Sequence, residues 1–260
     1  MKKEYEIRLL EKKEMAQDNW FLTFSCPEIA DTAKPGQFVN LSCSRLLKRP
    51  FGIADTNKEK GTFSIGVKVS GEGTREITSY PVDYVFDALG PLGNAFSFDG
   101  VKKIIAVGGG TGIYPLHFAL KTADEMGIPT ICVNGFRSKN DAFLVDECSR
   151  SAQKAIFTTD AGDFGIQGTV LDGLASLSKE EIEFSHVFCV GPEIMMKHVS
   201  SWAEENGLFC QVSMEKRMAC GIGVCLVCVC KLKAKEEGKP FKHVRCCKDG
   251  PVFLAEEVIW

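Results

Sequence analysis

The sequence predicts a β + α/β protein made of an antiparallel β-barrel, a doubly wound parallel sheet and a small cysteine-rich domain, in that order. Three observations support this prediction. Short strand-like segments fill the chain up to about residue 98, strands alternate with helical segments from about residue 101, and six of the 12 cysteines lie between Cys220 and Cys247. The expected domains therefore span residues 1–98, 99–213 and 214–260.

The first domain is predicted from short segments separated by turn residues. Between residues 62 and 69, apolar residues alternate with Ser64, Gly66 and Lys68, as in a strand with one buried face. Turn signals such as Lys34-Pro35-Gly36 lie between such segments. Several short strands at this spacing favour an antiparallel barrel or sandwich. The expected strands cover residues 4–12, 20–26, 37–43 and 62–69.

The second domain is predicted from strands that alternate with helices. An apolar strand over 103–107 leads into the glycines of 108–112 and then into a helical segment that runs to about Met126. This alternation indicates a parallel sheet with helices on both faces. Later strands are expected at 130–134, 155–159, 186–190 and 208–213, with helices over 170–177 and 193–205.

Composition and charge exclude several classes of protein. Of the 260 residues, 45% are hydrophobic and 25% charged, which allows a sizeable core and excludes bulk disorder. The 31 Lys and Arg against 34 Asp and Glu give a net charge of −3, so no nucleic-acid partner is expected. No apolar run approaches the roughly 20 residues of a membrane-spanning helix, and the N-terminus has no secretory signal. We therefore expect a cytoplasmic protein with no membrane partner.

The cysteines of the last domain indicate a metal centre, because disulfides are not expected in a reducing compartment. Cys220, Cys225 and Cys228 have the spacing C-x4-C-x2-C, which is that of plant-type [2Fe–2S] ligands. Two irons bridged by two sulfides need four thiolates. The fourth ligand is Cys246 or Cys247, whose side chains point in opposite directions if this stretch is extended.

The loop around these cysteines contains the glycines that a cluster needs. Gly221 and Gly223 allow backbone angles closed to other residues and let amide N–H groups approach the sulfurs. The alternatives are a zinc site, which usually has two C-x2-C pairs, and no metal at all. Cys230 is expected to be a bystander, and the six earlier cysteines are expected to pack in the core. The charged run 231–237 is expected to form a solvated loop or hairpin end.

Two glycine-containing segments have the character of phosphate-binding loops. Gly108–Gly112 lies between a strand and a helix, where bare backbone and the helix N-terminus favour a phosphate. In the first domain, Gly71–Thr74 ends a strand and opens a short helix over 75–80, with Thr74 near its N-cap and Arg49 as a candidate charge partner. The alternative at both places is an ordinary turn that binds nothing.

Over essentially the whole chain, these features resemble the ferredoxin–NADP reductase superfamily. They most closely resemble its family of electron-transfer subunits of NAD-dependent, type 1B dihydroorotate dehydrogenases. The motifs that carry the resemblance are R-P-F-G at 49–52, G-E-G-T at 71–74, G-G-G-T-G-I at 108–113, C-G-I-G-V-C-L-V-C at 220–228 and C-K-D-G-P-V-F at 247–253. In this family the cysteine of the last motif is a cluster ligand, which selects Cys247 over Cys246.

The resemblance also implies which residues bind each cofactor. The cluster ligands are Cys220, Cys225, Cys228 and Cys247. FAD is expected to contact Arg49, Pro50, Phe51, Gly52, Gly66, Val67 and Lys68, and its pyrophosphate to meet Gly73 and Thr74. The nicotinamide nucleotide loop corresponds to Gly109, Gly110, Thr111 and Gly112. Two residues depart from the family pattern: Gly52 replaces a hydroxyl residue that lies near flavin N5, and Val190 replaces a frequent cysteine.

The family resemblance implies a function in pyrimidine biosynthesis. Electrons would pass from the FMN of a dihydroorotate dehydrogenase catalytic subunit through [2Fe–2S] and FAD to NAD⁺, in a heterotetramer of two catalytic and two electron-transfer subunits. Hydride transfer needs no protein acid or base, so no catalytic residue is assigned. One alternative is an NAD(P)H-linked flavin and iron–sulfur reductase subunit that serves a different partner oxidoreductase. Another is a redox-sensing module whose cluster controls binding.

Overall fold

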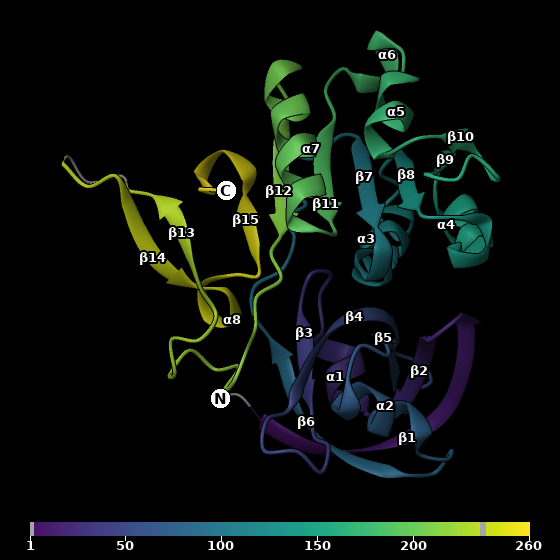
Figure 1. Ribbon diagram of the computed structural model, residues 1–260, viewed down its shortest axis with the longest axis vertical. Helices are drawn as coiled ribbons and strands as arrows, with labels where there is room; N and C mark the ends of the chain where they lie inside the picture. Colours follow the sequence, from purple (N-terminus) through teal and green to yellow (C-terminus); the bar gives the residue numbers. More distant parts are fainter. Residues whose placement is uncertain (1–2, 235–237) are drawn as a thin grey trace.

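The computed structural model describes residues 3–234 and 238–260, and its first part is a closed barrel of antiparallel strands (Figure 1). The strand order is β1-β2-β5-β4-β3-β6. The strands are β1 (Lys3–Ala16), β2 (Asn19–Ser25), β3 (Phe38–Leu41), β4 (Arg49–Asn57), β5 (Thr62–Lys68) and β6 (Val85–Leu92), and the helices of this part are α1 (Pro27–Thr32) and α2 (Glu72–Ser79). Fully buried side chains such as Phe24, Ile53 and Phe63 fill its core.

The second part is a sheet in the order β10-β9-β8-β7-β11-β12-β15, in which every neighbouring pair is parallel except β12 with β15. Helices cover both of its faces. Helices α3 and α4 pack against one face, and α5 and α7 pack against the other. The elements are β7 (Ile104–Gly109), α3 (Ile113–Glu125), β8 (Thr130–Phe136), α4 (Val145–Ser151), β9 (Lys154–Thr159), β10 (Ile166–Gln167), α5 (Val170–Ala175), α6 (Lys179–Ile182), β11 (His186–Val190), α7 (Glu193–Glu205) and β12 (Phe209–Ser213).

The third part, which we call the cluster arm, is residues 214–251. It contains the hairpin of β13 (Val229–Lys233) and β14 (Phe241–Arg245) and the short helix α8 (Cys246–Asp249). The chain then returns to the parallel sheet as β15 (Val252–Leu254), where Val252 pairs with Ser213 of β12. Figure 1 shows the arm as the yellow-green region beside the barrel and the sheet. The arm therefore starts and ends on two neighbouring strands.

The predicted fold class is confirmed, although the sequence pattern missed several strands. β4 contains Pro50 and Gly52, and β6 contains Gly90-Pro91, which are residues that weaken a strand pattern. Barrel closure nevertheless pairs β4 with β3 and β5, and β6 with β1 and β3. The run at 231–237 begins within β13, and residues 235–237 lie outside the described residues. None of the described helices is both long and apolar enough to cross a membrane.

The barrel and the parallel sheet meet at the first turn of α3. A Cβ atom built on Gly66 of β5 would lie 1.9 Å from the Tyr114 ring, and one on Gly52 of β4 would lie 3.0 Å from Pro115. On its other side, the Tyr114 ring stacks on Phe143 with the ring centroids 4.6 Å apart. Two positions without side chains thus allow α3 to lie directly on the barrel wall.

We expect Gly66→Ala to reduce the free energy of unfolding by about 1–3 kcal/mol, because the added methyl group overlaps a buried ring. Urea or thermal unfolding measures this change. Gly71→Ala is the control, since a Cβ atom there meets nothing within 4 Å and only the smaller cost of alanine at the N-cap of α2 is expected. An equal loss of stability in both variants would contradict the proposed packing of Tyr114 on the barrel.

Candidate functional site

A first cavity, of about 340 Å³, lies where the barrel faces α3. It brings together seven of the nine residues expected to bind FAD, which are Arg49, Pro50, Phe51, Gly52, Gly66, Lys68 and Thr74. The other two do not line it. Val67 is fully buried with its side chain in the barrel core, and Gly73 lies beneath Arg49.

The N-terminus of α2 and Arg49 form the polar end of the first cavity. A Cβ atom on Gly73 would lie 2.6 Å from Nε of Arg49, so glycine lets the guanidinium lie against the helix. Thr74 is the third residue of α2 and not its cap, because Gly71 is the N-cap. The Thr74 hydroxyl accepts hydrogen bonds from the N–H groups of Ser70 (2.9 Å) and Gly71 (3.2 Å). A helix N-terminus beside an arginine suits a pyrophosphate.

The structure gives a physical reason for the glycine at position 52. Pro115 of α3 occupies the space in front of Gly52, with only 3.0 Å between its Cβ and a Cβ atom built on the glycine. A serine at this position would press its side chain against the proline ring. In this chain only the backbone of residue 52 can therefore hydrogen-bond a ligand in the first cavity.

A second cavity, of about 600 Å³, lies at the carboxyl ends of β7, β8 and β11. Gly109, Gly110 and Thr111 of the predicted nucleotide loop line it. Gly110 has a φ of 55°, which favours glycine. Gly112 does not line this cavity, because a Cβ atom there would lie 2.4 Å from the carbonyl oxygen of Val190. Ligands of open α/β sheets bind at the carboxyl ends of the strands, as this cavity does.

The two cavities share three residues, which are Lys68, Thr111 and Glu215. Lys68 and Thr111 were predicted as binding residues, whereas sequence reasoning missed Glu215. It follows β12 and belongs to no motif, so only its position in the folded chain reveals it. Burial raises the pKa of its carboxyl group. Because they share a wall, molecules bound in the two cavities would lie next to each other.

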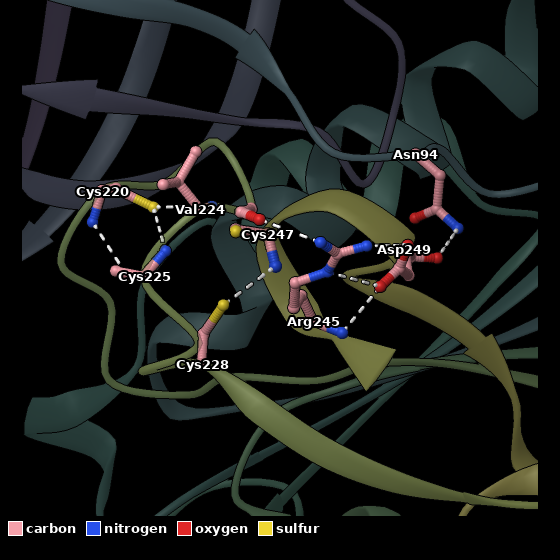
Figure 2. Close-up of polar contacts among 9 residues, drawn as sticks. Asn94, Cys220, Val224, Cys225, Cys228, Arg245, Cys247 and Asp249 are labelled. Atoms are coloured by element: carbon pink, nitrogen blue, oxygen red, sulfur yellow. Dashed lines mark hydrogen bonds and ion pairs between the residues drawn. The ribbon is translucent and has the colours of Figure 1, made fainter. Parts of the chain in front are cut away.

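The four predicted cluster ligands fall into two pairs (Figure 2). The sulfur of Cys220 accepts the N–H group of Cys225 at 3.4 Å, and the sulfur of Cys225 accepts that of Cys220 at 3.5 Å. The sulfur of Cys228 accepts the N–H group of Cys247 at 3.4 Å. The first pair lies near the surface and the second is buried. Two pairs suit two irons that each take two thiolates.

The pKa values of two of these thiols are shifted in opposite directions. Burial alone would raise the pKa of Cys220, but backbone N–H groups, first those of Ile222 and Cys225, lower the pKa to about 6. Burial, followed by the hydrogen bond with Cys228, raises the pKa of Cys247 to about 12. A thiol of this kind loses its proton when a cation replaces it.

The neighbouring cysteines have other partners. Cys246 is fully buried and its thiol donates a hydrogen bond to the carbonyl of Met214 at 3.0 Å. The two adjacent cysteines begin helix α8 rather than lying in extended chain, so the expected reason for their different directions was wrong. Cys230 is buried on β13 within the core that the arm shares with the sheet.

Hydrogen bonds hold the cluster loop to the rest of the arm, and the end of the arm to Asn94, which follows the barrel (Figure 2). The Arg245 guanidinium donates to the carbonyl of Gly223 at 2.9 Å, and its backbone N–H group donates to Asp249 at 2.8 Å. The N–H group of Asn94 donates to the carbonyl of Gly250 at the end of the arm at 2.7 Å, and its side chain donates to the carbonyl of Val252 at 2.7 Å and accepts the Val252 N–H group at 2.9 Å. The cluster loop is thus fixed within the arm, and the end of the arm is fixed to the segment that follows the barrel.

A barrel cavity that adjoins a cavity at the strand ends of a parallel sheet, with a four-cysteine arm attached, defines a class of protein. It is the class of reductases with the ferredoxin–NADP reductase fold that carry an iron–sulfur domain. The model of the "iron-sulfur cluster binding domain of dihydroorotate dehydrogenase B" matches residues 215–259. The chain belongs to the family of electron transfer subunits of dihydroorotate dehydrogenase B (NAD⁺), as the following relatives show.

The electron transfer subunit from Caldanaerobacter subterraneus is 35% identical over 263 residues, covering 100% of both chains. That from Fusobacterium nucleatum is 33% identical over 256 residues, covering 95% of each. The solved structure of an NADH-dependent reduced ferredoxin–NADP oxidoreductase has a TM-score of 0.86 and 31% identity, covering 97% of this chain and 89% of the other. The ferredoxin reductase of carbazole 1,9a-dioxygenase, at 16% identity and a TM-score of 0.69, shares the fold over 79% of this chain and 66% of its own.

We expect Cys247→Ser to lose most of the iron and sulfide, because it removes one of the two buried thiolates. Cys246→Ser is the matched control, since a serine hydroxyl can still donate to the Met214 carbonyl. Iron and acid-labile sulfide per chain measure both effects. Loss of iron from Cys246→Ser together with full retention in Cys247→Ser would reverse the assignment of the fourth ligand.

Proposed function

We propose that this chain is the electron-transfer subunit of a dihydroorotate dehydrogenase B, connecting an FMN-containing catalytic subunit to NAD⁺ in pyrimidine biosynthesis. The observation that carries the proposal is the common wall of the two cavities, formed by Lys68, Thr111 and Glu215. Hydride transfer requires the two reacting rings to touch, and adjoining cavities allow this contact. When bound, the cluster exchanges single electrons and FAD interconverts them with the hydride that NAD⁺ accepts.

The residues of the first cavity would bind and orient FAD. Arg49 and the free N–H groups of α2 supply positive potential for its pyrophosphate. Phe51 and Pro50 offer apolar surface to a flat ring, and Gly52 and Gly66 leave room for it. In the second cavity, Gly109 and Gly110 would let the phosphates of NAD⁺ approach the backbone.

The surface over the cluster ligands supports docking of a partner subunit. The loop that holds Cys220 and Cys225 exposes apolar side chains, with 75% of Val224, 64% of Leu226 and 53% of Val227 accessible. Exposed apolar side chains grouped around a functional loop are typical of protein interfaces. We propose that the catalytic subunit covers this loop in a heterotetramer. Cytoplasmic location is part of the proposal, because the eight cysteines that are not cluster ligands form no disulfide, as expected in reducing surroundings.

A second candidate function keeps the chemistry and changes the partner. The 31% identity to an NADH-dependent reduced ferredoxin–NADP oxidoreductase is close to the identities of the dihydroorotate dehydrogenase subunits. In the proposed scheme the partner oxidises dihydroorotate, so the two cavities of this chain do not distinguish one partner from another. The chain can therefore serve as an NAD(P)H-linked reductase subunit for another oxidoreductase.

The isolated chain, purified anaerobically, is expected to contain about one FAD, two irons and two sulfides. It is also expected to reduce an artificial electron acceptor with NADH, because the nicotinamide and flavin sites lie on one chain. Absorption spectra, metal analysis and dye reduction test this. A colourless protein that binds zinc would contradict the proposed function.

We expect Val224→Glu to weaken association with a co-expressed FMN-containing catalytic subunit about tenfold or more, since it places a charge at the centre of an apolar contact. Co-purification and a dihydroorotate-dependent NAD⁺ reduction assay measure this, while iron content stays unchanged. Phe184→Glu is the control, as Phe184 is 71% exposed but lies outside the cluster arm. A wild-type complex that forms but shows no dihydroorotate oxidation would favour the second candidate function.

A further inference from the structure

Glu215 is fixed at the junction of the two cavities by its neighbours on both sides. The Met214 N–H group donates to the carbonyl of Pro251 at 2.9 Å, and the Met214 carbonyl accepts the thiol of Cys246 at 3.0 Å. Lys216 forms an ion pair with Glu193 of α7 at 2.5 Å. The backbone at Glu215 is thereby held between the parallel sheet and the cluster arm, which keeps the residue at the junction of the two cavities.

The carboxylate of Glu215 has no partner of its own. Within the described ranges, neither a hydrogen bond nor an ion pair engages it. Its side chain is accessible because it faces the cavities, yet the surrounding protein desolvates it enough to raise its pKa. Lys68 is the one described cation that lines both cavities, and no ion pair joins it to Glu215. The negative charge at the junction is therefore not neutralised by a fixed contact.

This position matters because oxidised and reduced nicotinamide differ in charge at one place only. The ring of NAD⁺ carries a positive charge and that of NADH is neutral, while the phosphates, riboses and adenine are the same. Only a charge close to the ring can therefore distinguish the two forms electrostatically, and a partly desolvated carboxylate does so more strongly than one in open water. If hydride transfer occurs where the cavities meet, the ring must lie beside Glu215.

We propose that the Glu215 carboxylate selects the oxidation state of the nicotinamide, binding NAD⁺ in preference to NADH at the junction of the two cavities. This inference rests on the proposed function, in which NAD⁺ binds in the second cavity. Preferential binding of NAD⁺ raises the affinity for the electron acceptor and favours release of the product, NADH. Glu215 determines specificity in this scheme through its charge, and it neither gives nor takes a proton.

The test compares three ligands by titration calorimetry on the full chain with FAD and cluster bound. They are NAD⁺, tetrahydro-NAD, which has a neutral ring and cannot donate a hydride, and ADP-ribose, which has no nicotinamide. In Glu215→Gln, the affinity for NAD⁺ is expected to fall about tenfold relative to that for tetrahydro-NAD, the loss of one charge-assisted interaction. The affinity for ADP-ribose should stay within about twofold of wild type. Glu215→Asp, which keeps the charge, should restore most of the preference.

Glu205→Gln is the matched control, because Glu205 is an exposed carboxylate at the end of α7 that lines neither cavity. Equal changes for NAD⁺ and tetrahydro-NAD in Glu215→Gln, or no change in either, would overturn the inference. Unchanged binding of ADP-ribose and FAD shows that a variant is folded. If the wild-type chain binds neither NAD⁺ nor ADP-ribose, the proposed function itself fails.

Discussion

The pairing of Ser213 with Val252 is the constraint on which the functional part of this molecule depends. It joins the two ends of the cluster arm at the edge of the parallel sheet. The four cluster ligands therefore lie in a segment whose two ends are neighbours in space. The same closure positions Glu215 beside both cavities, since Met214 donates to Pro251 across it. Asn94 ties this point to the end of the barrel. One short stretch of β15 therefore fixes the three parts relative to each other.

The close contact between the barrel backbone and the rings of Tyr114 and Pro115 is the second feature on which the structure depends. Gly66 and Gly52 allow the first turn of α3 to touch the barrel, which brings the nucleotide loop that precedes α3 next to the first cavity. Gly52 is thus coupled to Pro115, and at this position the protein offers only its backbone to a ligand in the first cavity. Gly52 and Gly66 thus determine both the apolar contact between the two domains and the shape of the first cavity.

The sequence predicted the fold class and the cysteines of the cluster centre, because these depend on local spacing and local periodicity. Cys220, Cys225 and Cys228 lie in one loop, so their spacing alone indicates a common centre. The choice of Cys247 needed the family motif. β15 and Glu215 could not be predicted, since β15 has only three residues and Glu215 acquires its place from tertiary contacts. Strands β4 and β6 were missed because barrel closure, and not their own pattern, makes them strands.

The closed ends of the arm also bear on how such a protein can originate. An added segment that leaves from one strand and pairs back onto it, as the arm does through β15, disturbs its host very little, because it meets the host at a single place. Strand β12 would be the sheet edge without β15, so a simpler ancestor needs only an uncovered edge to accept the arm. An arm that carries a one-electron centre can be gained in this way as a unit. Recombination can also exchange it between reductases, while the nucleotide-binding sheet is inherited intact.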